Sequence, residues 1–272
     1  MQRLKALLSD FDGTLATDDK RISPVDRAAV ERLVKNGFKF ALVTGRMTAS
    51  ARRALANFPF YELIAAYNGA EIVDKSGEIL SEKYLSHKDG EELAAFAEER
   101  GINCHVYSDK VITPEILPLT KLYAKACDCK VERTGIKTSE FVRENKFSSP
   151  KLMFLDEKDK LDEFLPEIEE VFGQRFEIAR GGEYMLDFTA KGVDKGFAAR
   201  EIARLFDTDI SLVAAIGDGY NDLPMIEVAG VGIATANAVE KLKDVADFVC
   251  ENTNGSAVAE VVEKLFSGAI SR

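Results

Sequence analysis

Two acidic residues, Asp10 and Asp12, follow the first apolar segment of the chain, residues 4–9, and only one residue separates them. In extended backbone the side chains of residues i and i+2 point the same way, and Gly13 permits a sharp turn immediately afterwards. We therefore expect both carboxylates to face one reaction centre, where one can attack and the other can donate and accept protons. A solvated acidic loop has the same composition, so this motif needs support from the rest of the chain.

A second group of polar residues, Thr44-Gly45-Arg46, follows the apolar segment 38–43. At the end of a strand the Thr44 hydroxyl can donate a hydrogen bond to a phosphoryl oxygen. Arg46 can add positive charge to the same site, or it can pair with a surface carboxylate. Thr44, Gly45 and Arg46 are therefore candidate residues for binding phosphate or substrate.

Lys195 is the third candidate, because it lies between Gly192 and Gly196 where an amphipathic helix begins. A cation at the first turn of a helix faces the positive end of the helix dipole, which is unfavourable. A bound anion would offset that cost. The alternative is an ordinary lysine on a solvated surface.

The fourth motif is the loop 217–222, with the sequence Gly-Asp-Gly-Tyr-Asn-Asp, which follows a strongly apolar segment at 212–216. Its glycines allow a tight turn that presents Asp218 and Asp222 close to the expected position of Asp10. Three carboxylates in one pocket repel one another unless a cation lies among them. Oxygen ligands alone favour Mg²⁺.

Two residues of this loop have more than one expected role. Asp222 begins an apolar helix, so its charge also suits the N-terminal end of that helix. Asn221 can contact the substrate, or it can orient Asp12.

The order of the elements indicates how these motifs are positioned. Apolar strand-like segments alternate with amphipathic helices up to about residue 81, a mixed pattern follows, and the alternation resumes after about residue 190. We therefore predict an α/β fold: a doubly wound, mostly parallel, Rossmann-like core formed by residues 1–81 and 189–272, with an inserted α/β cap domain formed by residues 82–188. Ligands of such sheets bind beyond the carboxyl ends of the strands, where three of the motifs lie.

Composition limits the partners. The chain has 272 residues, of which 46% are hydrophobic, and this is enough for a core with an insertion. The net charge is −10 without a long basic run, which argues against nucleic acid or an anionic membrane as the main partner. Four scattered cysteines, no apolar stretch of about 20 residues and a short N-terminal apolar segment predict a cytoplasmic protein without a signal peptide.

The four motifs, in this order, resemble those of the haloacid dehalogenase superfamily, and the form of the fourth motif and the place of the insertion resemble its Cof-type branch, subfamily IIB. The resemblance implies a Mg²⁺-dependent phosphatase that works through an aspartyl-phosphate, with Asp10 as nucleophile and Asp12 as proton carrier. It implies metal ligation by Asp10, Asp12, Asp218 and Asp222. It also implies contacts with phosphate or substrate from Thr44, Gly45, Arg46, Lys195 and Asn221.

The expected substrate is a small phosphorylated metabolite, such as a sugar phosphate or a phosphorylated hydroxy acid like phosphoglycolate. A phosphotransferase or phosphomutase on the same scaffold is an alternative, and so is a regulator without activity. The cap is expected to close over the site and to select the leaving group. The quaternary structure is expected to be a monomer or a homodimer.

Overall fold

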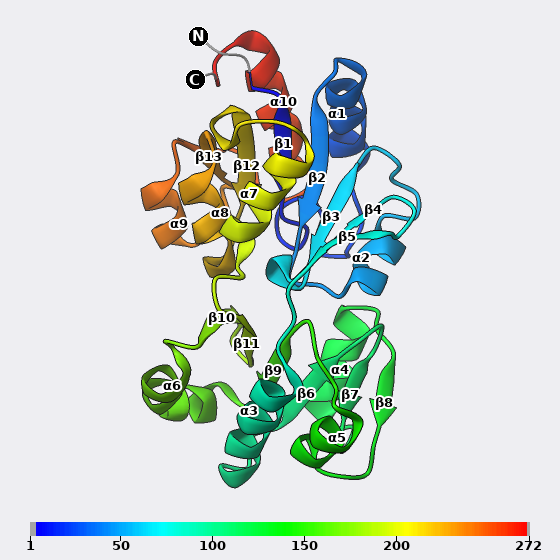
Figure 1. The fold of residues 1–272 in the computed structure, drawn as a ribbon. Helices are drawn as coiled ribbons and strands as arrows, with labels where there is room; N and C mark the ends of the chain where they lie inside the picture. The colour runs from blue at the N-terminus through cyan, green and yellow to red at the C-terminus, as the bar shows by residue number, and fades with distance from the viewer. Residues whose placement is uncertain (1–3, 271–272) are drawn as a thin grey trace.

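The chain forms two β-sheets with their own helices, as the computed structural model in Figure 1 shows. The structure describes residues 4–270. The larger sheet has eight strands in the order β14-β13-β12-β1-β2-β3-β4-β5. Its strands are β1 (Ala6–Ser9), β2 (Lys39–Val43), β3 (Leu63–Ala66), β4 (Glu71–Asp74), β5 (Ile79–Glu82), β12 (Val213–Gly217), β13 (Val231–Ala234) and β14 (Phe248–Val249).

The larger sheet is parallel from β14 to β3, and only β4 and β5 run antiparallel to their neighbours. Every residue of β1 and β12 is buried, as expected for central strands covered on both faces. Helices α1, α2 and α10 pack on one face and α7, α8 and α9 on the other. These helices are α1 (Pro24–Lys35), α2 (Thr48–Ala54), α7 (Lys195–Leu205), α8 (Leu223–Val228), α9 (Glu240–Val245) and α10 (Ala257–Ser267).

The smaller sheet has six strands in the order β10-β11-β9-β6-β7-β8, and all of its pairs are antiparallel except β7 with β8. Its strands are β6 (Cys104–Tyr107), β7 (Val111–Thr113), β8 (Val131–Arg133), β9 (Leu152–Leu155), β10 (Phe176–Gly182) and β11 (Met185–Ala190). The helices of this part of the chain are α3 (His87–Glu99), which precedes β6, and α4 (Pro118–Ala126), α5 (Thr138–Asn145) and α6 (Lys158–Phe172), which lie between the strands.

The smaller sheet has a separate apolar core on one face, where α3, α5 and α6 pack. Its other face, with α4, lies toward the larger sheet: Ser50 on α2 donates a hydrogen bond to the carbonyl of Cys127, at the end of α4. A mostly parallel core sheet with a second, mixed sheet as a cap confirms the predicted fold class. Among residues 4–270, no helix is both long enough and apolar enough to cross a membrane.

Asp26 links α1 to α10, and we expect it to make core stability depend on pH. Its buried carboxylate accepts a hydrogen bond from the Ala259 amide at 2.8 Å, whereas Oδ2 has no hydrogen-bond partner within residues 4–270. Burial raises the pKa of Asp26 to about 6. The native state then binds this proton more tightly than the unfolded state, so the protonated carboxyl of Asp26 contributes to the free energy of unfolding. This contribution is complete below about pH 4 and is lost as the pH rises through 6.

The Asp26→Asn variant does not titrate at this position. The difference in free energy of unfolding, variant minus wild type, is therefore expected to increase by up to about 3 kcal/mol between pH 4 and pH 7, because only the wild type loses stability through this group. Urea denaturation of both proteins at the two pH values measures the difference. Parallel pH profiles would contradict a native pKa of about 6.

Candidate active site

Three of the four motifs follow adjacent parallel strands, so their side chains meet at one edge of the larger sheet. Asp10 follows β1, Thr44 follows β2, and Asp218 follows β12, while β1 lies between the other two strands. The Asp10 amide donates a hydrogen bond to the Ile216 carbonyl at 3.0 Å, which ties the first motif to the fourth. The carboxyl edge of the sheet is thus the place where the predicted site residues converge.

Lys195, at the start of α7, is buried beneath this edge and bridges two carboxylates. Its side chain is 1% exposed, and Nζ lies 2.7 Å from Asp10 Oδ1 and 2.6 Å from Asp222 Oδ1. Asp194 fixes the helix start by accepting a hydrogen bond from the Phe197 amide at 2.7 Å. Burial alone lowers the pKa of Lys195, but the charges of Asp10 and Asp222 outweigh burial and raise it. Lys195 is therefore a charged group of the site rather than a surface lysine.

Three carboxylates form an acidic cluster, because oxygens of Asp10, Asp218 and Asp222 all lie within 4.8 Å of one another. Asp222 Oδ2 accepts hydrogen bonds from the amides of Asp218 and Gly219 at 3.0 and 2.8 Å. Asp218 Oδ1 accepts one from Thr14 at 2.6 Å. Among the residues that the structure describes, none donates a hydrogen bond to the second oxygen of Asp10 or of Asp218. A cluster in which two carboxylates each keep an oxygen without a hydrogen bond suits a divalent cation with oxygen ligands.

The protonation of the cluster also favours a cation. Burial, together with the charges of Asp222 and Asp218, raises the pKa of Asp10 well above its usual range, although Lys195 opposes this. Burial and the charge of Asp222 raise the pKa of Asp218 to about 6. A divalent cation would stabilise both groups as anions.

Gly13 lets the first motif approach the cluster closely. Its φ is +80°, and a Cβ atom at this position would lie 2.3 Å from Asp218 Oδ2. A side chain here would strain the backbone and displace the Asp218 carboxylate.

Asp12 lines the same cavity as Asp10 and Asp218, and two cations hold it. Arg46 donates through Nε and Nη2 to the two oxygens of Asp12 at 2.6 and 2.7 Å, and Lys20 donates at 2.8 Å. Arg46 is 5% exposed, and its guanidinium lies 4.6 Å above the centre of the Phe11 ring. Burial alone raises the pKa of Asp12, but Arg46 and Lys20 outweigh burial and lower it. Arg46 thus pairs with a carboxylate, but with one inside the site.

The remaining predicted residues hold the loops of the site together. The Thr44 hydroxyl accepts a hydrogen bond from the Arg46 amide at 3.2 Å. Asn221 donates to Asn68 Oδ1 at 3.3 Å and makes no hydrogen bond to Asp12. Asn68 has a φ of 58°, and its side-chain Nδ2 donates to Asp187 Oδ2 at 3.3 Å. The sequence indicates a turn at Asn68-Gly69, and the family resemblance implies that this loop borders the substrate pocket; the contact of Asn68 with Asp187 was not predicted.

Two further residues, Lys151 and Asp187, were not predicted from the sequence. Both are buried, and their charged groups lie 2.9 Å apart, on the smaller sheet. Lys151 also donates to the Gly45 carbonyl at 3.2 Å, so the pair contacts the second motif. A charged residue next to or within an apolar strand was the available signal, since such residues are seldom buried without a partner. Lys20 carried no comparable signal, because it lies in a polar loop.

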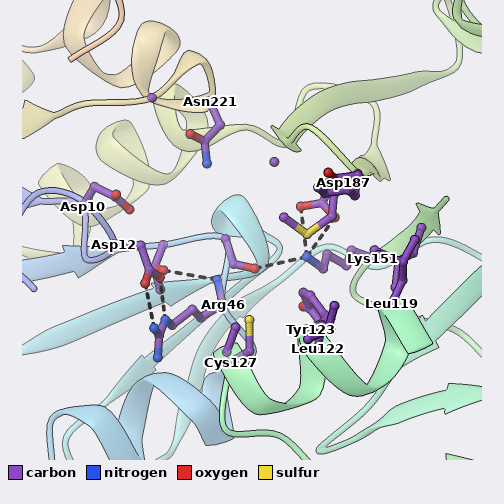
Figure 2. Close-up of a pocket in the computed structure, with 18 of the residues that line it drawn as sticks. Asp10, Asp12, Arg46, Leu119, Leu122, Tyr123, Cys127, Lys151, Asp187 and Asn221 are labelled. Carbon is purple, nitrogen blue, oxygen red and sulfur yellow. Dashed lines mark hydrogen bonds and ion pairs between the residues drawn. The ribbon is translucent and has the colours of Figure 1, made fainter. Parts of the chain in front are cut away.

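A cavity of about 650 Å³ lies between the two sheets. One wall carries the motif residues Asp10, Asp12, Thr44 and Arg46, and the opposite wall comes from α4 and the smaller sheet. In Figure 2, Asp10 and Asp12 lie at one end, while Lys151 and Asp187 lie at the other. Lys195 and Asp222 do not line the cavity. Lys195 contacts the lining residue Asp10, and Asp222 contacts Lys195. The arrangement places two carboxylates at one end of a partly open space that is large enough for a metabolite.

The chain is similar to known proteins over almost all of its length. Residues 7–262 match the family model described as haloacid dehalogenase-like hydrolase. The Bacillus subtilis protein YwtE, a 5-amino-6-(5-phospho-D-ribitylamino)uracil phosphatase, is 27% identical over 288 residues, covering 97% of this chain and 99% of its own. A crystal structure of a haloacid dehalogenase-like hydrolase from Bacteroides thetaiotaomicron has a TM-score of 0.84 at 27% identity, covering 97% of this chain and 100% of that one. A subclass IIB sugar phosphatase has a TM-score of 0.83 at 24% identity, covering 98% and 100%, and supports the fold.

Proposed function

The chain belongs to the haloacid dehalogenase-like hydrolase family and is a phosphatase of small phosphomonoesters, and from this premise we propose that it forms an aspartyl-phosphate on Asp10 with Mg²⁺ as cofactor. The observation that supports this most is that Asp10 lines the cavity and that Lys195 holds one of its oxygens, while the other accepts no hydrogen bond from residues 4–270. A carboxylate fixed on one side and open on the other is positioned to attack a phosphorus atom.

The proposed reaction has two steps. An oxygen of Asp10 attacks phosphorus, the bond from phosphorus to the leaving oxygen breaks, and Asp12 gives its proton to that oxygen. Asp12 then removes a proton from water, which attacks the aspartyl-phosphate and releases inorganic phosphate. Arg46 and Lys20 keep Asp12 ionised in the free enzyme. A phosphate group in the cavity competes for these cations, which raises the pKa of Asp12 and favours its acid form.

We assign the remaining site residues to phosphate and metal. Asp10, the Asp12 main-chain carbonyl and Asp218 would hold Mg²⁺, and Asp222 would support the site through Lys195 and the 217–222 loop. Bound there, the ion supplies positive charge against the carboxylates and the phosphoryl oxygens. The proposed contacts with the phosphate and the substrate come from Thr44, Gly45, Arg46, Lys195 and Asn221.

Activity is expected to require added Mg²⁺, because burial and the neighbouring carboxylates disfavour the ionised form of Asp10, and a divalent cation in the acidic cluster would favour it. Release of inorganic phosphate from a small ester, followed in metal-stripped buffer, with EDTA and after readdition of Mg²⁺, tests this. The expected result is loss in the first two conditions and recovery in the third. Full turnover in metal-stripped buffer would contradict the mechanism, and phosphate transfer to an alcohol without release would favour the phosphotransferase alternative.

The division of labour between the two sheets is part of the proposal. We propose residues 1–81 and 189–272 as the catalytic core and residues 82–188 as the cap that selects the leaving group. The larger sheet carries the four motifs, and the smaller sheet with α4 forms the opposite wall of the cavity, which supports this division. Sugar phosphates and phosphorylated hydroxy acids are the first esters to test, together with the ribitylamino-uracil phosphate named for YwtE.

A further inference from the structure

The cavity wall opposite Asp10 is mainly apolar. Four of its side chains come from α4, at positions spaced by three, one and three residues, which places them on one face of the helix. Figure 2 shows three of them, Leu119, Leu122 and Tyr123, across the cavity from Asp10 and Asp12. The apolar and aromatic side chains of this wall include Leu119, Leu122, Tyr123, Ala126, Tyr184 and Met185.

Part of this wall is exposed although it is apolar. Leu122 is 63% exposed and Tyr184 is 40% exposed, while both line the cavity. Large apolar side chains that face an open cavity are stabilised when a ligand covers them, by about 25 cal/mol per Å² of buried apolar surface. The group that covers these side chains is the leaving group of the substrate, because a phosphate ester held at Asp10 extends its leaving group toward α4.

The charged groups near this wall disfavour an anionic leaving group. Asp187 and Glu157 line the cavity here, together with a single cation, Lys151. Lys151 is already engaged by Asp187 and by the Gly45 carbonyl. Lys151 and Asp187 offset each other, so Glu157 leaves a net negative charge near this wall, which disfavours a carboxylate on the leaving group. An uncharged aromatic ring on the leaving group meets no electrostatic repulsion there, and it can pack against the rings of Tyr123 and Tyr184.

We propose that the substrate is a phosphomonoester whose alcohol bears no carboxylate and carries a flat apolar ring that packs against α4. This inference rests on the proposed function, because it takes the phosphate to lie at Asp10. It ranks ring-bearing esters above simple sugar phosphates and above phosphorylated hydroxy acids. Leu122 is then a specificity-determining residue, since it is the most exposed large apolar side chain of the α4 wall.

The test compares 2-phenylethyl phosphate with n-propyl phosphate, whose leaving alcohols are similarly weak acids. With Mg²⁺ present, kcat/KM is expected to be about tenfold higher or more for the phenyl ester. Phosphoglycolate is expected to be the poorest of the three. Leu122→Asp should reduce the phenyl-to-propyl ratio about tenfold. Leu117→Asp is the matched control, because Leu117 precedes α4, is 39% exposed and does not line the cavity; its ratio should equal that of the wild type.

The outcomes separate the inference from the proposed function. Equal kcat/KM for the two esters, or a Leu117→Asp effect as large as that of Leu122→Asp, would overturn the ring preference and leave the phosphatase mechanism in place. Turnover of neither ester would count against the mechanism. In that case calorimetric titration of the Asp10→Asn variant with both esters decides the inference: tighter binding of the phenyl ester supports it, and equal affinity overturns it.

Discussion

Replacing Asp10 by asparagine is expected to lower kcat by about 10⁴-fold or more, while the protein keeps its fold. An amide is a poor nucleophile, so the aspartyl-phosphate cannot form at a useful rate. The fold should persist because the amide oxygen can still accept the hydrogen bond from Lys195, and because one of three mutually repelling carboxylates is gone. Phosphate release measures the loss, and thermal denaturation checks the fold.

Asp26→Asn is the matched control for this variant. Asp26 is also a buried aspartate of the larger domain, but it lies between α1 and α10 and does not line the cavity. Its replacement should leave kcat within about twofold, as expected for a substitution that touches no reacting group. The double variant Asp10→Asn/Asp12→Asn should be little worse than Asp10→Asn alone, because groups that act as one unit do not lose activity additively. Near-normal turnover by Asp10→Asn would move the nucleophile to another residue.

Lys195→Met is expected to lower both stability and activity. The variant leaves the buried carboxylates of Asp10 and Asp222 without their shared cation, and the removal of one partner of a buried pair costs about 3–5 kcal/mol. Added Mg²⁺ should restore part of this stability by binding the native state. Urea denaturation with and without Mg²⁺ measures both effects, and phosphate release is expected to fall by orders of magnitude.

The control for this variant is Lys243→Met. Lys243 pairs with the largely exposed Glu240 on α9, and such a surface pair contributes about 1 kcal/mol at most. Its loss should therefore change the free energy of unfolding by no more than that amount, with normal activity. If Lys195→Met were as stable as Lys243→Met, the bridge between the two carboxylates would contribute nothing to the fold.

The sequence predicted the helices well where apolar residues recur at helical spacing over two or more turns. In the sequence, apolar spacing and end signals such as proline or a polar turn mark residues 118–126, 138–145 and 158–172 as helical, and these segments coincide with α4, α5 and α6. Apolar segments ending in polar motifs also located β1, β2 and β12. The two-residue β14 escaped prediction, since two residues show no periodicity.

The contacts within the site were less predictable than the positions of its residues. The order of apolar segments and polar motifs predicted that Asp10, Thr44 and Asp218 lie at strand ends. It could not indicate that Arg46 binds Asp12 rather than a surface carboxylate. Nor could it bring Lys151 to the Gly45 carbonyl, because these residues are 106 positions apart and lie on different sheets. Such pairs depend on how the two sheets face each other, which no local pattern encodes.

The buried pair of Lys151 and Asp187 has a consequence for the divergence of related chains. A lineage can alter α4 one residue at a time, because exposed side chains such as Leu122 change at little cost to stability. The two residues of the pair cannot be replaced one at a time in this way. Replacing either partner leaves the other charge buried and unpaired, which costs about 3–5 kcal/mol. This is a large share of the 5–15 kcal/mol that is the typical free energy of unfolding of a protein. Homologous chains should therefore vary freely at the exposed positions of α4, while positions 151 and 187 are retained or replaced together.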